Sequence, residues 1–320
     1  MREPSSPRFY EAASLIKRAL SLPRSLTLRC VALTGMEENH KVAYIGGGES
    51  LGYYRRLGAL RVSVDESVSL LRSGSRVAEH LAEGALVVVE LNRMLGRWVP
   101  HGGLFSLPWV RQKVDLGGAA YRSRISKIEA TFGRKVRRHG HHCRITRDRE
   151  QVSAFYRDFY RPYVRMRYGE DAHPRSLAEL RAAVRQGLLL KVFVGSDWVA
   201  GAVCRVWGKE VSTLAFAALP DDGQRLRQGV LSSVYYFLFR WAMENGMETV
   251  DLLRSRPHTG DGVYEHKRRW GARAVLDSWP HTGLWLFPPA SCVLPAAFRG
   301  HLVWDGTGFV ELQQVIQTGE

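Results

Sequence analysis

The order of apolar segments in the second half of the chain constrains its fold more than any other feature. Three strand-like runs are separated by short turns at Gly195 and Gly208, which predicts three successive antiparallel strands. A helix with a wide apolar face, a strand, a basic amphipathic segment and a last strand pair follow. In chain order these segments are residues 188–194, 198–206, 211–217, 229–246, 248–253, 263–272, 274–279 and 282–287. This order predicts an α/β fold with a mixed sheet.

The first half carries weaker signals. Its patterns predict a helix at residues 9–20 and strands at 26–33 and 41–46, with a longer apolar run at 85–95. The glycine-rich residues 45–58 lack both a Walker lysine and GxGxxG spacing, so a structural turn is the better interpretation. Glycines 117 and 118 suggest a boundary, which divides the chain into units 1–118 and 119–320.

Two further helices are expected between these regions. Residues 176–187 begin with the capping pair Ser176 and Glu179. Residues 151–169 are rich in aromatic side chains among arginines, and either a buried helix face or a platform that stacks nucleic-acid bases fits this pattern. The aromatic residues are Phe155, Tyr156, Phe159, Tyr160 and Tyr163.

Positive charge is concentrated in one stretch. The chain has a formal net charge of +15 and a pI near 10, which favours an anionic partner such as RNA, a nucleotide-bearing cofactor or an anionic membrane surface. Residues 111–170 hold sixteen Lys and Arg against six Asp and Glu, and therefore +10 of this charge. A helix beginning near residue 121 carries the candidate anion-binding residues, although a solvated helix face is the alternative. These residues are Arg134, Lys135, Arg137 and Arg138.

Several classes of protein are disfavoured. No run of eighteen apolar residues and no signal peptide is visible, and four scattered cysteines argue against a disulfide framework or a zinc ribbon. Residues 139–143, HGHHC, offer poor tetrahedral geometry and are better interpreted as a strand edge, so no metal is expected. We expect a cytoplasmic protein. A peripheral location at the inner face of the membrane is the alternative.

A motif at residues 242–272 resembles the GNAT superfamily of acyltransferases, and within it the Fem-type (FemAB-like) transferases and the acyltransferases associated with cellulose and polysaccharide biosynthesis. Those relatives carry a helix ending in A-x-x-x-G, a strand, a small-residue loop and an aromatic-x-x-K-x-x-[FW]-G signature. The matching residues here are Ala242, Gly246, Tyr264, Lys267, Trp270 and Gly271. The resemblance covers about residues 134–288, and it implies a degenerate first GNAT-like unit followed by a better preserved second one.

The resemblance implies acyl transfer to an amine or hydroxyl acceptor. Such a reaction needs a group that stabilises the developing oxyanion, and the signature places Lys267 near the reacting carbonyl, beside Tyr264. His258 has a suitable unperturbed pKa for proton transfer, with a solvated loop residue as the alternative. Asp251 alternates with apolar neighbours on its strand, and its carboxylate is expected to face the cleft or water.

The donor loop departs from the GNAT pattern Q/R-x-x-G-x-G/A. Residues 220–234 match it fully in neither register, although Arg225, Arg227 and Gly229, together with Arg254, are candidate donor-binding residues. The donor is therefore left open between an acyl-CoA or acyl carrier thioester and an aminoacyl-tRNA. A catalytically silent module that binds RNA or an assembly partner is the alternative function.

Overall fold

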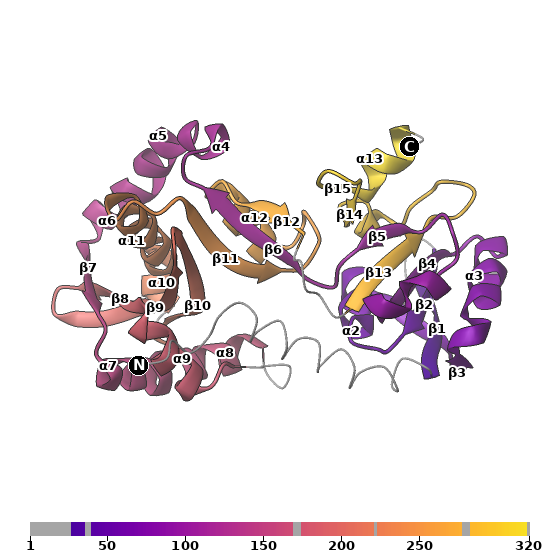
Figure 1. Ribbon diagram of the computed structural model, residues 1–320, viewed down its shortest axis with the longest axis horizontal. Coiled ribbons are helices and arrows are strands. Elements are labelled where there is room, and N and C mark those ends of the chain that lie inside the picture. Colours follow the sequence, from indigo (N-terminus) through magenta and orange to yellow (C-terminus); the bar gives the residue numbers. More distant parts are fainter. Residues whose placement is uncertain (1–26, 36–39, 169–173, 221–222, 277–281, 319–320) are drawn as a thin grey trace. The chain divides into compact units, whose positions relative to one another are not determined.

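The computed structural model describes residues 27–35, 40–168, 174–220, 223–276 and 282–318 (Figure 1). They form two compact units. Unit 1 contains the described residues up to Val110, residues 255–265 and those from 274 onward, whereas unit 2 contains Arg111–Arg254 and His266–Arg273. The chain thus contributes to unit 1 in three separate segments, which differs from the expected division at residue 118. The helix expected at residues 9–20 lies outside the described residues.

Unit 1 is built on a six-stranded sheet with the order β3-β1-β2-β4-β13-β5, accompanied by a two-stranded sheet. Its strands are β1 (Thr27–Gly35), β2 (Lys41–Gly46), β3 (Leu60–Ser69), β4 (Leu86–Asn92), β5 (Leu104–Ser106), β13 (Thr282–Phe287), β14 (Leu302–Trp304) and β15 (Phe309–Glu311). Its helices and short helical turns are α2 (Leu51–Leu57), η2 (Leu70–Arg72), α3 (Ser73–Ala82), η3 (Arg93–Trp98), η7 (Ala296–Phe298) and α13 (Leu312–Thr318).

The core of unit 1 forms on both faces of this sheet. Every residue of β4 is buried, and its side chains alternate between two apolar clusters, with Leu86 and Val88 in one and Val87 and Val89 in the other. A strand that is buried on both faces reads as a continuous apolar run, which is why residues 85–95 stand out in the sequence.

A second, seven-stranded sheet has the order β12-β6-β11-β10-β9-β8-β7. Its strands are β6 (Val110–Asp115), β7 (His141–Thr146), β8 (Gly187–Val194), β9 (Asp197–Trp207), β10 (Glu210–Ala218), β11 (Thr249–Ser255) and β12 (Arg273–Val275). The accompanying helices are α4 (Ala119–Arg122), α5 (Ile125–Ile128), the π-helical η4 (Glu129–Gly133), α6 (Arg134–Arg138), α7 (Arg149–Ala154), the π-helical η5 (Phe155–Tyr160), α8 (Arg161–Tyr168), α9 (Leu177–Arg185), α10 (Gly223–Arg227), α11 (Val230–Glu244) and α12 (Gly262–Arg269).

The mixed α/β fold expected from the sequence is confirmed. Strands β8, β9 and β10 form the predicted antiparallel meander, and β10 pairs with β11 in parallel. The predicted last strand pair is wrong: β12 joins the seven-stranded sheet, whereas β13 lies between β4 and β5 in the other. Each segment pairs with strands that are distant in sequence, which a local apolar pattern cannot reveal.

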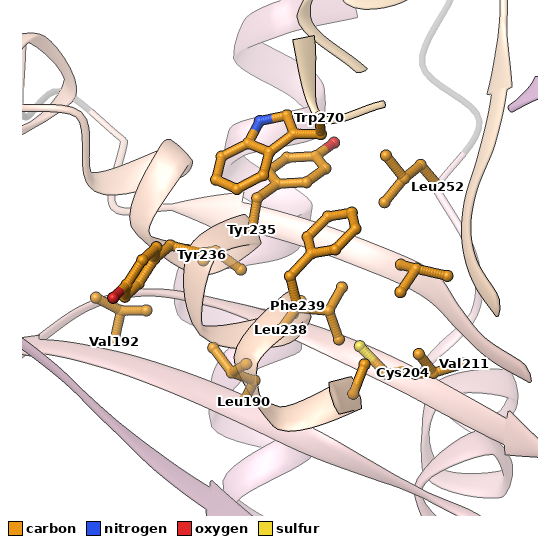
Figure 2. Packing of buried hydrophobic residues seen from close by; sticks show 14 of the residues in the cluster. Leu190, Val192, Cys204, Val211, Tyr235, Tyr236, Leu238, Phe239, Leu252 and Trp270 are labelled. Atoms are coloured by element: carbon orange, nitrogen blue, oxygen red, sulfur yellow. The ribbon is translucent and has the colours of Figure 1, made fainter. Parts of the chain in front are cut away.

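Helix α11 covers one face of the meander, as its apolar periodicity predicted. Figure 2 shows Tyr235, Leu238 and Phe239 of this helix above side chains from three strands. These strand side chains include Leu190 and Val192 of β8, Cys204 of β9 and Val211 of β10. The helix ends at Glu244, and Gly246 follows with a φ of +67°.

Helices α7 to α9 cover the opposite face. Phe155, Phe159, Tyr160 and Tyr163 are buried there, so the buried-face interpretation of the aromatic helix is confirmed and these rings cannot stack bases. The predicted capping box at Ser176 begins α9. Among the described residues, no helix is long and apolar enough to cross a membrane.

Candidate functional site

Strands β10 and β11 are paired over a short stretch only. Three residues of β10, ending at Ser212, pair with three of β11, ending at Asp251. Strand β10 nevertheless continues to Ala218 and β11 to Ser255. In unit 1, the parallel strands β2 and β4 stay paired over five residues, as far as Gly46 and Glu90. Strands β10 and β11 are thus no longer paired after Ser212 and Asp251. The predicted site residues Asp251 and Arg254 lie on this part of β11.

Asp251 lies at the point of separation and is completely buried. Its Oδ2 accepts from the Arg111 guanidinium at 2.7 Å, and Ser212 Oγ lies 3.4 Å from the same oxygen. Its Oδ1 accepts from the Leu253 amide at 2.8 Å. The expectation that this carboxylate faces water is therefore wrong. With both oxygens occupied by protein donors, Asp251 holds β6, β10 and β11 together.

The bond from Leu253 to Asp251 stabilises an unusual main-chain bend. Leu253 has a φ of +60°, a left-handed conformation that costs a non-glycine residue energy. The carboxylate of Asp251, two residues earlier, accepts a hydrogen bond from the amide of Leu253 and so offsets part of this energy. Beyond it, the carbonyls of Leu253 and Arg254 both accept from the Lys267 ammonium.

Lys267 is only 5% exposed. Its Nζ donates to Arg254 O at 2.9 Å and lies 3.4 Å from Leu253 O, which compensates in part for removing the charge from water. The neighbouring signature residues fix its position. Trp270 is fully buried and stacks on Phe132 at 4.3 Å between ring centroids, and Gly271 has a φ of +89° at the end of α12. The signature therefore places one cation beside the bent end of β11.

Tyr264 and His258 have structural contacts in unit 1. Tyr264 is buried in an apolar cluster with Leu107 and Leu302. His258 Nδ1 accepts from the Gly260 amide and its Nε2 lies 2.9 Å from Ala297 O, so the ring is the neutral Nε2–H tautomer. Burial lowers the pKa of His258. The alternative of a solvated loop histidine is therefore wrong.

The candidate donor loop ends at the first turn of α11. Gly229 has a φ of +86° and directly precedes this 15-residue helix. Arg227 and Arg254 are exposed, whereas Arg225 forms an ion pair with Asp197 at 2.8 Å. Gly229 and the exposed Arg227 therefore lie at the start of this helix, whereas Arg225 is paired with Asp197.

All four candidate anion-binding residues of α6 are exposed, and one of them reaches the donor loop. A Cβ atom placed on Gly229 would lie 3.5 Å from Lys135 Cδ. Arg137 forms an ion pair with Glu129, whose Oε2 also accepts from the Tyr236 hydroxyl. The sequence did not indicate that these two candidate regions meet.

Sequence reasoning missed a buried pair beside the same turn. His141 Nδ1 lies 2.6 Å from Ser233 Oγ, and Ser233 Oγ also lies 3.2 Å from Gly229 O. Burial, with a smaller contribution from His139, lowers the pKa of His141 to about 4. His141 belongs to β7, which confirms the strand-edge interpretation of HGHHC. Within the described part of the chain, no three His, Cys, Asp or Glu side chains are grouped as metal ligands.

Comparison with solved structures finds distant likenesses over much of the chain. FemX is 11% identical, with 81% of this chain and 84% of that chain covered and a TM-score of 0.41. L-PGS from Bacillus licheniformis is 12% identical, with 84% and 83% covered and a TM-score of 0.39. A GCN5-related N-acetyltransferase from Sphaerobacter thermophilus is 13% identical, with 82% and 76% covered and a TM-score of 0.33.

By their names, FemX and the GCN5-related N-acetyltransferase belong to the two groups that the signature resembles. No protein-family model and no curated protein sequence matches the chain. The roles of individual residues therefore rest on the geometry of this chain.

Proposed function

We propose that the protein is an acyltransferase that transfers an acyl or aminoacyl group to an amine or hydroxyl acceptor. The observation that carries the proposal is the buried Lys267 ammonium beside the end of β11, where this strand has parted from β10. The acceptor attacks the acyl carbonyl carbon, the carbonyl oxygen becomes an oxyanion, and the ammonium stabilises that charge. Collapse of this intermediate re-forms the carbonyl and expels the donor's thiolate or alkoxide. The proton that the acceptor loses neutralises the expelled thiolate or alkoxide.

The start of α11 is the proposed place for the donor's phosphates. Amides in the first turn of a helix and its dipole favour an anion, and Lys135 adds a positive charge next to Gly229. The four exposed cations of α6 favour a large polyanion such as aminoacyl-tRNA over a single acyl-CoA. An anionic membrane surface that carries a lipid-linked acceptor remains the second source of negative charge in this proposal.

The test is an unbiased donor screen on the purified full chain. A panel of acyl-CoA thioesters and charged tRNAs is incubated with the protein, and donor deacylation and product mass are followed by mass spectrometry. Lys267→Ala and the size-matched Lys267→Met should lower turnover more than about a hundredfold, because one oxyanion-stabilising group is worth about 2.7–4 kcal/mol. Lys267→Arg should restore little activity.

The matched control is Lys209→Ala, which removes an exposed lysine paired with Glu248 in the same unit. Its turnover should equal that of the wild type. Folding of each variant is checked by circular dichroism and thermal unfolding, since removing Lys267 also takes a donor from the carbonyls of Leu253 and Arg254. Wild-type turnover in a folded Lys267→Met variant would remove Lys267 from the mechanism.

A catalytically silent module that binds RNA or an assembly partner is the second candidate. It is favoured by the bonds of the Lys267 ammonium to main-chain carbonyls and of Asp251 to Arg111, which are structural contacts. Saturable tRNA binding without deacylation of any donor in the same screen would support this candidate over the enzyme.

A further inference from the structure

The guanidinium of Arg256 lies against two aromatic rings of unit 1. Its Cζ lies 3.8 Å from the ring centroid of Trp109 and 4.6 Å from that of Tyr53. Its Nη1 also lies 3.4 Å from Pro108 O. Contact with two rings restricts the motion of the guanidinium, and cation–π attraction holds it there without using its N–H groups.

Most N–H groups of this arginine have no partner in the part of the chain that the structure describes. A guanidinium has five of them, and among the described residues Arg256 makes the single hydrogen bond to Pro108 and no ion pair. Asp261 is the carboxylate whose charge acts on Arg256, but its Oδ1 accepts from the Val263 and Tyr264 amides instead. Partial burial, which lowers the pKa of Arg256, is therefore not offset by a carboxylate in contact.

Tyr53 supplies a second donor, its side-chain hydroxyl. Its hydroxyl oxygen is buried and has no hydrogen-bond partner among the described residues. Burial, followed by the charge of Asp261, raises the pKa of Tyr53, so the hydroxyl keeps its proton and can donate it. A buried donor of this kind is uncommon, because leaving it unpaired costs about 1–3 kcal/mol.

We propose that Arg256 and Tyr53 form a binding site for a phosphate group. A planar guanidinium with a free edge matches the bidentate geometry of phosphate oxygens, and the tyrosine hydroxyl donates to the same anion. Arg56 adds a second positive charge near enough to lower the pKa of Arg256, which favours a dianion over a singly charged carboxylate. Trp109 is 41% exposed and Arg256 is half-buried, so these two residues lie at the surface of the unit, with the Tyr53 hydroxyl beneath it.

The site is independent of the proposed acyl transfer. Its residues lie in unit 1, whereas Lys267 belongs to unit 2, and binding can be measured without turnover. The phosphate group could belong to a small soluble molecule or to a lipid headgroup, and the experiment separates these sources.

The test measures binding to the full chain at constant ionic strength. Inorganic phosphate and glycerol 3-phosphate are titrated calorimetrically, and phosphatidylcholine vesicles with and without phosphatidic acid are tested by co-sedimentation. Wild type should bind at least one phosphate probe saturably. Arg256→Gln should weaken that binding by about tenfold or more, because charge-assisted hydrogen bonds are lost.

Two further variants each change one hydrogen-bond donor of the site and keep the rest of the side chain's size or charge. Tyr53→Phe keeps the stacked ring and should weaken binding by several-fold, and Arg256→Lys keeps the charge but should bind markedly less well than the wild type. Arg61→Gln, an exposed arginine on β3 of the same unit, is the control and should bind like the wild type.

The outcomes separate the explanations. Binding of soluble phosphate or of phosphatidic acid vesicles that is lost in both Arg256→Gln and Tyr53→Phe supports the site. The probe that binds better shows whether the phosphate group belongs to a soluble molecule or to a lipid. A folded Tyr53→Phe or Arg256→Lys variant with undiminished binding, or no saturable binding of any probe by the wild type, would overturn the proposal and leave the contacts of Arg256 with Tyr53 and Trp109 as packing alone.

Discussion

At the scale of single residues, Asp251 decides whether the end of β11 keeps its shape. Asp251→Ala should lower the free energy of unfolding by about 3–5 kcal/mol, because it leaves Arg111 and the Leu253 amide without their buried partner. Urea unfolding measures this change. The control Glu244→Ala breaks an exposed pair with Arg240 and should cost less than about 1 kcal/mol. A loss of similar size in both variants would contradict the structural role of Asp251.

His141 gives a second residue-scale prediction, on pH. Its pKa in the folded protein is about 4, below the ordinary value of 6.5, so the unfolded chain binds this proton more readily. The stability that depends on neutral His141 is therefore complete above pH 6.5 and declines as the pH falls toward 4. Urea unfolding of wild type and His141→Gln across this range isolates the effect from other histidines. A stability difference between them that does not change with pH would contradict the prediction.

At the scale of elements, α6 is the predicted polyanion contact. Replacing Arg134, Lys135, Arg137 and Arg138 together by alanine should weaken tRNA binding and flatten its salt dependence. Each phosphate contact contributes about 0.7–0.9 to the slope of log K against log salt, and Arg137 already pairs with Glu129. We therefore expect the slope to fall by about three times this contribution, one for each of the other three residues. The control replaces two other exposed arginines of unit 2, at positions 149 and 185. An unchanged slope would contradict this prediction and support the alternative that α6 presents a solvated helix face.

The start of α11 carries the corresponding prediction for the donor. If this turn bound the pyrophosphate of coenzyme A, a hundredfold excess over the dissociation constant would stabilise the protein by about 2.7 kcal/mol. The donor loop lacks the full GNAT pattern, so we expect little thermal shift with coenzyme A and a larger, salt-sensitive shift with charged tRNA. A saturable coenzyme A shift that Gly229→Val abolishes would reverse this choice. Gly195→Val strains a turn with φ of +57° and is the matched control.

At the scale of the whole molecule, the division of the chain predicts which fragments fold. Strand β13 pairs with both β4 and β5, and its Leu284 and Leu286 are fully buried in unit 1. A fragment of residues 1–118 lacks this strand and should therefore fail to form a stable fold. Its amide spectrum by two-dimensional NMR should show the poor dispersion of an unfolded chain. A well-dispersed spectrum from this fragment would show that the first segment of unit 1 is sufficient.

The sequence revealed those parts of the molecule that are encoded locally. The meander, α11 and the Ser176 capping box depend on residues near one another in the chain, and each was predictable. The partners of β13 were not, because Leu284 pairs with Glu90 and Ser106, which no local pattern records. The signature indicated Lys267, but not the left-handed Leu253 that brings two carbonyls to it, since leucine carries no preference for that conformation.

The three-part construction of unit 1 also has a consequence in time. A ribosome makes β1 to β5 first, yet the central partner of β4 and β5 comes from residues 282–287. Most of unit 2 is synthesised in between, as one continuous segment, and its meander joins neighbouring strands by short turns. Contacts between distant segments form slowly, because a long loop must close first. The unit that is synthesised first is therefore the one that finishes folding last, and until then its open sheet edges are exposed to aggregation and to chaperones.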